Sequence, residues 1–214
     1  MVTLPFYSKP LQTRLELLNE KLKIQQSVEV MAKACLDTLI FFHQELDTWK
    51  TKNTSNICKS KCSHCCSHWV DGLDSFEALA IYHQLRSRKD FTHLLTLFFE
   101  RDTLFEKHSL TSLEYDDTLD LFFKDNLGCP TLSSDATCTI YSFRPLICSL
   151  YQAQKSSELC KPNMIEKKPE NNQILEIDLR HQKLLATIDS NLRNLNIPES
   201  YFQAMLHLFE NETK

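Results

Sequence analysis

Eight of the nine cysteines in the chain fall into two groups, and the chemistry that these groups offer is metal binding by thiolates. The first group has the pattern Cys-x3-Cys-x2-Cys-Cys. The second contains a Cys-Pro pair, a Cys-x-Ile-Tyr-x-x-Arg-Pro-x-x-Cys motif and one further cysteine. Thiolates are soft ligands for zinc, copper(I) and iron–sulfur iron, and gaps of two or three residues let a turn direct several sulfurs toward one centre. The candidate metal ligands are Cys58, Cys62, Cys65, Cys66, Cys129, Cys138, Cys148 and Cys160.

The number of thiols leaves the identity of the metal open between zinc and an iron–sulfur cluster. Two adjacent cysteines, Cys65 and Cys66, cannot easily occupy equivalent tetrahedral positions around one ion, so one of them can bridge, serve a second site or pack beneath the first. Up to eight thiolates would be enough for one cluster, with some thiolates not used as ligands, or for two sites of four ligands each. This count exceeds the needs of one zinc ion and favours iron–sulfur. The ninth cysteine, Cys35, lies on an apolar helical stripe and is predicted to be a core residue.

Charged and ring residues beside the cysteines have two interpretations each. Arg144 could neutralise a thiolate-rich centre or hydrogen-bond its sulfurs, and it could equally be a surface or carbonyl-bonding arginine. Pro145 is predicted to fix the turn between Arg144 and Cys148. His64 and His68 flank the adjacent cysteine pair and could bind zinc, although the thiolates already supply enough ligands.

Together these motifs resemble the YkgJ-type cysteine-cluster family, which is described as a zinc- or iron-chelating domain. The resemblance covers about residues 57 to 152 and depends mainly on the second motif. The first gap has three residues where many relatives have two, and Ser149 stands where an arginine is common. Cys160 lies outside the matched motif. The resemblance implies metal-binding roles for Cys58, Cys62, Cys65, Cys66, Cys129, Cys138 and Cys148.

Helical periodicity dominates the rest of the chain and must position the two cysteine groups. Asp74 and Glu77 form a capping-box pattern, Asp90 is a predicted N-cap, and Gly128 is predicted to end a helix. Residues 129–171 are predicted to be irregular, with a short strand or turn at 138–141. The predicted helices cover residues 10–50, with a break near 25–27, then 75–88, a segment beginning at 91, 112–127, 172–195, and a last one from about 200 to 210.

Composition excludes several other classes of protein. Two glycines, where about 15 would be average, argue against dinucleotide-binding units, phosphate loops and most β-folds. The formal net charge is −4 and no segment is strongly basic, so nucleic acid is not an expected partner. The start of the chain lacks the features of a secretory signal, and the apolar runs are too short to span a membrane. We therefore expect a cytoplasmic protein, whose thiols stay reduced.

The sequence predicts a mainly α protein, a helical bundle in which two irregular cysteine-rich segments converge on a metal site. Residues 1–214 would form a single helical domain, with the metal-binding region at about 57–160. The predicted function is to hold an iron–sulfur cluster or zinc, without a defined activity and with no protein partner indicated. One alternative is an S-adenosylmethionine-dependent enzyme, either protein lysine N-methylase-like or of the radical type, whose Cys-x3-Cys-x2-Cys spacing recurs here. Another is an interaction module with structural zinc.

Overall fold

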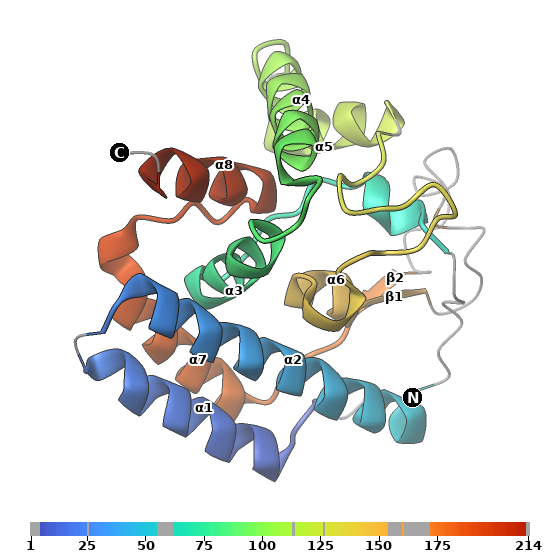
Figure 1. The fold of residues 1–214 in the computed structure, drawn as a ribbon. Helices are drawn as coiled ribbons and strands as arrows, with labels where there is room; N and C mark the ends of the chain where they lie inside the picture. Colours follow the sequence, from blue (N-terminus) through green and yellow to red (C-terminus); the bar gives the residue numbers. More distant parts are fainter. Residues whose placement is uncertain are drawn as a thin grey trace.

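The computed structural model describes residues 5–24, 26–54, 62–112, 114–125, 127–153, 160 and 172–212. These ranges are mainly helical, as predicted, with one pair of short strands (Figure 1). The α-helices are α1 (Lys9–Lys23), α2 (Val28–Asn53), α3 (Ser75–Leu85), α4 (Phe91–Ser109), α5 (Tyr115–Lys124), α6 (Leu146–Leu150), α7 (Leu179–Leu192) and α8 (Tyr201–Glu212), the 3-10 helices are His64–Ser67, Tyr141–Phe143 and Arg193–Leu195, and the strands are β1 (Tyr151–Ala153) and β2 (Asn172–Ile174).

The predicted break in the first helical segment separates α1 from α2. Ser8 and Ser27 act as N-caps, since their hydroxyls accept hydrogen bonds from the backbone N–H of Leu11 at 3.2 Å and Val30 at 3.4 Å. Serine at this position satisfies a backbone donor that the helix itself leaves unpaired. The capping box at the start of α3 is also confirmed, because the Asp74 N–H donates to a Glu77 carboxylate oxygen at 3.0 Å.

The helices pack in two groups around one apolar core. α1 contacts α2 and α7 along one side of the molecule, while α4 contacts α5 and α8 on the other (Figure 1). Between them lies α3, which contacts α2, α7 and α8. Nine of the residues of α3 are buried, including Phe76 and Ile81, so this helix is the centre of the core. Cys35 of α2 is fully buried there, as predicted, and burial raises the pKa of its thiol to about 12.

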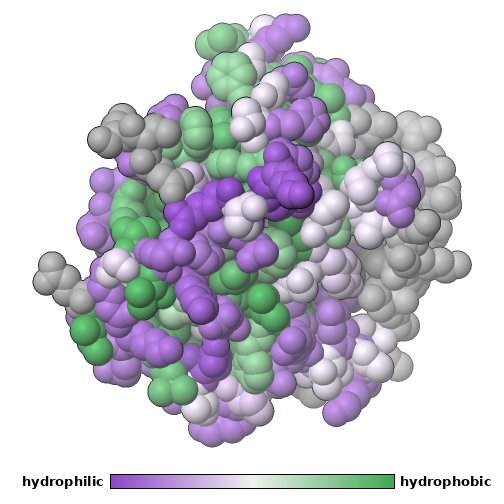
Figure 2. Space-filling view, viewed as in Figure 1, coloured by the Kyte–Doolittle hydropathy of each residue, from purple (hydrophilic) through white to green (hydrophobic). Residues whose placement is uncertain are grey.

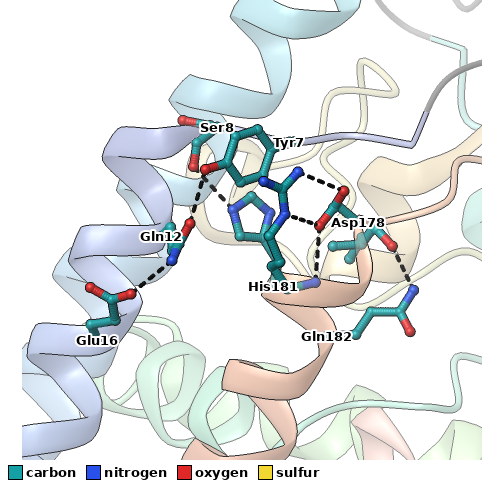
Figure 3. Close-up of polar contacts among 9 residues, drawn as sticks. Tyr7, Ser8, Gln12, Glu16, Asp178, His181 and Gln182 are labelled. Carbon is teal, nitrogen blue, oxygen red and sulfur yellow. Dashed lines mark hydrogen bonds and ion pairs between the residues drawn. The ribbon is translucent and has the colours of Figure 1, made fainter.

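The N-terminal segment is fastened to the start of α7 by a cluster of ring and polar contacts, which we call the N-terminal clasp (Figure 3). The Tyr7 ring stacks on His181 with centroids 5.1 Å apart, and the Arg180 guanidinium lies 3.5 Å from the Tyr7 ring centroid. Arg180 also pairs with Asp178 at 2.7 Å, and the Tyr7 hydroxyl donates to Gln12 at 2.9 Å. The clasp joins the start of the chain to a helix near its end.

Three sequence predictions about element boundaries are wrong. The segment 129–171, predicted to be irregular, contains the short helix α6 and the strand β1. The helix predicted over 112–127 begins at Tyr115 and ends at Lys124, so Gly128 follows it at a distance and does not cap it. The start of the helix predicted from residue 172 is instead β2, which pairs antiparallel with β1 in the register Tyr151↔Ile174. A three-residue strand is too short to show a period of its own, and the spacing of Ile174 and Ile177 also matches a helix.

The surface mixes polar and apolar side chains. On the face shown in Figure 2, hydrophilic side chains lie among scattered hydrophobic ones. Exposed apolar residues occur singly on several helices, including Leu17 of α1, Phe99 of α4 and Leu121 of α5. Within the described residues, no helix is both long enough and apolar enough to cross a membrane.

Candidate metal centre

Five of the eight candidate ligands line a single cavity of about 320 Å³, which we call the thiol cavity. Two of them come from the first cysteine group and three from the second: Cys65, Cys66, Cys129, Cys138 and Cys148. Of the other three, Cys62 and the buried Cys160 are described but do not line the cavity, and Cys58 lies outside the described residues. The cavity thus brings together thiols that are more than sixty positions apart in the chain.

The first wall of the cavity comprises residues 64–71. Cys65 and Cys66 lie in the 3-10 helix His64–Ser67, where the Cys66 N–H donates to the Ser63 carbonyl at 2.9 Å. The tight turn presents both sulfurs at the cavity. The chain then turns away from the cavity at Gly72. The φ angle of Gly72 is +74°, a value that glycine adopts without strain. The glycine that follows the first cysteine group is therefore required by the turn.

A buried arginine of α4 holds this wall against the second one. The Arg101 side chain is 2% exposed, and its guanidinium donates to the carbonyls of His68 at 2.9 Å and Ser67 at 3.4 Å. It also donates to the carbonyl of Leu127, two residues before Cys129. Its charge lies over the rings of two phenylalanines of α5 and α8. One side chain therefore connects the backbone beside both cysteine groups.

The second wall comprises residues 127–151 and supplies three thiols from three local structures. Cys129 lies in the loop after α5, where its sulfur is 3.3 Å from the Thr131 hydroxyl. Cys138 closes a small loop through an isolated bridge with Leu132, which realises the strand or turn predicted there. Cys148 lies in α6, directly after the turn at Pro145. These turns and the short helix direct all three side chains to the same cavity.

Three buried polar side chains of α2 and α3 anchor the segment 144–149. The Glu77 carboxylate accepts the N–H of Leu146 at the start of α6, at 2.5 Å. One ring nitrogen of His43 lies 2.8 Å from the Arg144 carbonyl and the other 3.0 Å from the Ser149 hydroxyl. The Lys50 ammonium donates to the Ser149 carbonyl. The helix that carries Cys148 is therefore bound to the helical body at both ends.

Arg144 turns out to have a defined role in the wall. Its Nε donates to the Ser149 hydroxyl at 2.7 Å, and its guanidinium carbon lies 4.0 Å from the centroid of the Tyr141 ring. The side chain also lines the cavity. Burial raises the pKa values of Cys138 and Cys148, and the charge of Arg144 opposes this shift; at Cys65 the same charge adds to the lowering of the pKa by the Cys66 hydrogen bond. This fits the prediction of a charge beside the thiols, with contacts that hold it in place.

The thiols of the cavity resist losing their protons together. Burial is the main cause that raises the pKa values of Cys138 and Cys148, and neighbouring thiolates raise both further. A hydrogen bond from the Cys66 thiol to the Cys65 sulfur lowers the pKa of Cys65 and raises that of Cys66. Several thiolates can coexist here only if positive charge is added, and a bound metal cation supplies such charge.

Other residues of the cavity were not identified from the sequence. Tyr201, the first residue of α8, is fully buried, and its hydroxyl lies beside that of Thr131, outside the geometry of a full hydrogen bond. Nothing local in the sequence marks it. Arg101 does have a signal, because it interrupts the apolar stripe of α4 between Phe98 and Phe105. His68, which was predicted as a possible zinc ligand, lines the cavity, whereas His64 does not.

The donor atoms at the cavity fit a soft metal, but they are not preassembled. Within the described residues, no three histidine, cysteine, aspartate or glutamate side chains are arranged so as to hold a metal ion. Five thiols and a buried imidazole nitrogen of His68 without a hydrogen-bond partner nevertheless surround the same space. Sulfur and imidazole nitrogen are the ligands that zinc and iron–sulfur centres use. Binding would require the thiols to turn toward a common point.

Comparison with known proteins identifies the cysteine region. The model of the CxxCxxCC family, described as "Putative zinc- or iron-chelating domain", matches residues 57–175. This range is more than half of the chain and includes both walls of the thiol cavity, while His43, Lys50 and Tyr201 lie outside it. No curated protein and no solved structure matches the chain. The chain therefore belongs to the CxxCxxCC family of zinc- or iron-chelating domains.

Proposed function

We propose that this protein binds an iron–sulfur cluster or zinc in the thiol cavity, where its two cysteine segments converge. The observation that carries the proposal is that five thiols from both segments line one cavity. The family description supports a metal of this kind. The proposed ligands are drawn from the five cavity cysteines together with Cys58, Cys62 and Cys160, and four of them would complete a zinc site or a cluster.

Two arginines favour an anionic centre over a neutral one. Arg144 lines the cavity, and Arg101 is buried near it, where burial lowers its pKa to about 10 and the nearby Cys129 and Cys66 partly oppose that shift. No ion pair with a carboxylate is found for either arginine in the described part of the chain. Four thiolates around zinc or iron leave a net negative charge, which these two cations would balance. An iron–sulfur cluster would supply electron transfer, and zinc would supply a structural or Lewis-acid centre.

The alternative functions gain no support from these contacts. A radical S-adenosylmethionine enzyme resembles a β/α barrel, whereas the described residues are mainly helical. No observation favours a methyl-donor site or a partner surface for an interaction module. We also propose that residues 1–214 act as one helical domain, with the metal-binding region at about 57–160, in the reducing environment of the cytoplasm.

Anaerobic purification followed by metal and acid-labile sulfide analysis tests the proposal. A brown protein with stoichiometric iron and sulfide would identify a cluster, and a colourless protein with stoichiometric zinc would identify a zinc site. Because a bound metal stabilises only the folded chain, removing it with a chelator should lower the free energy of unfolding. Neither zinc, iron nor sulfide at stoichiometric level would contradict the proposal.

Two cysteine substitutions provide the matched comparison. Cys129→Ser removes a cavity thiol, and we expect it to lose most of the bound metal. Cys35→Ser changes a fully buried cysteine of α2 that does not line the cavity, and we expect it to retain the metal. Equal metal content in the two variants would place the centre elsewhere.

A further inference from the structure

The thiol cavity contains more space than its sulfurs need. A cavity of about 150 Å³ lined by apolar side chains is large enough to bind benzene. The thiol cavity measures about 320 Å³, roughly twice as much, and falls in the range of small-molecule binding sites. A structural zinc site is usually closed around its ion, so a cavity of this size has room for a second occupant beside a metal centre.

The walls away from the sulfurs are mostly apolar. They are formed by side chains of α5, α6, β1, β2 and the first wall, namely Trp69, Tyr115, Leu119, Ile147, Tyr151 and Ile174. Tyr115 and Ile174 are more than half exposed, so this part of the cavity reaches the surface. The charged side chains of the lining, Asp71 and Arg144, already have polar or ring partners within the protein. Against the apolar walls a charged ligand would lose its hydration, whereas an uncharged apolar one would gain from burial.

Two buried polar atoms of the cavity residues have no hydrogen-bond partner within the described residues, the Tyr201 hydroxyl, which lies beside that of Thr131, and one ring nitrogen of His68. The Nε2 of His68 is buried and makes no hydrogen bond within the described residues. The ring is held in place by stacking on Phe123, with centroids 3.7 Å apart and planes 16° apart. A buried polar group without a partner costs free energy, and a ligand with one hydrogen-bonding group would remove that cost.

We propose that the thiol cavity also binds a small, uncharged organic molecule, mostly apolar and with one hydrogen-bonding group, between the thiols and the apolar walls. The apolar part of this ligand packs against Trp69, Leu119 and Ile147, and its polar group bonds to Nε2 of His68. The proposal goes beyond metal binding, because it assigns the protein a second ligand beside the centre.

Fluorine NMR of the anaerobically purified protein, with its metal content measured on the same sample, tests this proposal. The probe is 4-fluorophenol, with fluorobenzene and 4-fluorobenzoate as comparisons. We expect saturable binding of 4-fluorophenol, affinity about fivefold weaker for fluorobenzene, which lacks the hydrogen-bonding group, and weaker binding still for the charged benzoate. Tighter binding of the benzoate would show that the site prefers anions and would overturn the proposal.

Two pairs of variants locate the site. Leu119→Trp fills the cavity from α5 and should weaken binding of 4-fluorophenol at least about tenfold, whereas Leu121→Trp, on the same helix but outside the cavity, should not. His68→Phe keeps a ring for stacking on Phe123 but lacks the nitrogen, so it should bind 4-fluorophenol and fluorobenzene equally. His64→Phe, beside the same cysteines but outside the cavity, should keep the preference.

The metal measurement separates failure of this proposal from failure of the first. Probe binding to protein that lacks stoichiometric metal would contradict metal binding and leave the cavity ligand supported. Metal-loaded protein that binds no probe would contradict the cavity ligand alone, because the metal centre would then fill the whole cavity. Equal probe binding by Leu119→Trp and the unmodified protein would also overturn it.

Discussion

The two walls of the thiol cavity are held in different ways. Among charged side chains, the first wall depends on one, Arg101, whose guanidinium donates to two carbonyls of that wall and one of the second. Uncharged contacts add to it, namely the stacking of His68 on Phe123 and the Tyr201 N–H bonded to the Val70 carbonyl at 2.9 Å. The segment 144–149 of the second wall is anchored by three side chains from two helices, His43, Lys50 and Glu77. The charged anchor of the first wall is a single side chain, which we call a concentrated anchor, whereas the second wall has a distributed anchor of three side chains. Single substitutions should therefore affect the two walls to different extents.

The difference also concerns charge. Arg101 is buried and bonded to carbonyls and rings, so its cation is offset by dipoles. Burying a cation in this way is costly unless every contact is kept, and removing the cation leaves three carbonyls without their donor. The backbone of the second wall is instead held by three side chains: the carboxyl group of Glu77, whose pKa burial raises to about 8, the ammonium group of Lys50 and the neutral ring of His43. We infer that the first wall is the more sensitive of the two.

The largest effect is expected for Arg101→Met, which keeps much of the side-chain volume and removes the guanidinium. Loss of several charge-assisted hydrogen bonds should lower the free energy of unfolding by about 3 kcal/mol, measured by urea denaturation. Metal content should fall as well, because the two walls lose their connection. Arg101→Lys retains the charge but cannot reach all three carbonyls, and should recover only part of the loss. If the free energy of unfolding of Arg101→Met were within about 0.5 kcal/mol of that of the unmodified protein, Arg101 would not be what joins the two walls.

A smaller effect is expected for Glu77→Gln in the distributed anchor. Both carboxylate oxygens accept backbone N–H groups, one from Leu146 and one from Asp74. Glutamine has a single oxygen, so one N–H would face an amide NH2, at a cost of about 1–2 kcal/mol in the free energy of unfolding. Urea denaturation measures the loss, with the exposed Glu106→Gln as the control that should change little. A loss of unfolding free energy as large as that of Arg101→Met would show that the second wall depends mainly on Glu77 and that its anchor is not distributed over three side chains.

The sequence predicts the helical body better than it predicts these anchors. The break between α1 and α2, the capping box of Asp74 and Glu77, and the burial of Cys35 all follow from local patterns of caps and apolar residues. Short patterns do not predict the element correctly. The three residues of β2 form a strand because β1 pairs with them, and not because of their own sequence pattern. Gly128 looked like a helix terminator by type alone, although α5 ends at Lys124.

The sequence likewise predicts only some of the residues of the thiol cavity. Residue type and spacing identify its thiols, but not which residues hold them in place. His43 and Lys50 contact a segment about one hundred positions away, and Tyr201 reaches the cavity from the last helix. Such contacts depend on tertiary packing, which no local pattern encodes. The usable signal is a polar residue on an apolar helical stripe, as with Arg101 on α4.

Acid should loosen the second wall through His43. Burial lowers the pKa of His43 from 6.5 to about 4, so the folded chain binds fewer protons than the unfolded chain between these two values. Stability from this residue is therefore present above pH 6.5 and is lost as the pH falls toward 4. Relative to His43→Gln, which cannot titrate, the unmodified protein should lose about 1 kcal/mol of unfolding free energy between pH 7 and pH 5.5.

Urea denaturation of both proteins at the two pH values gives this difference, in which the contributions of other groups cancel. His93→Gln, at an exposed position of α4, is measured alongside as the control for replacing a histidine with glutamine. A stability gap between His43→Gln and the unmodified protein that stays constant with pH would mean that His43 titrates alike in the folded and unfolded chains. The anchor would then not depend on a neutral imidazole.

The smallest effect is expected at another arginine that lies over a ring, Arg180 of the N-terminal clasp. It has a carboxylate partner, Asp178, and stacks on Tyr7, so like Arg101 it combines hydrogen bonds with a ring contact. Its side chain is 56% exposed, however, and water replaces lost contacts at such a site. Arg180→Met should therefore leave both the urea midpoint and the metal content unchanged within error. If it destabilised the protein as much as Arg101→Met, hydrogen bonding and ring contact rather than burial would explain the sensitivity of the first wall.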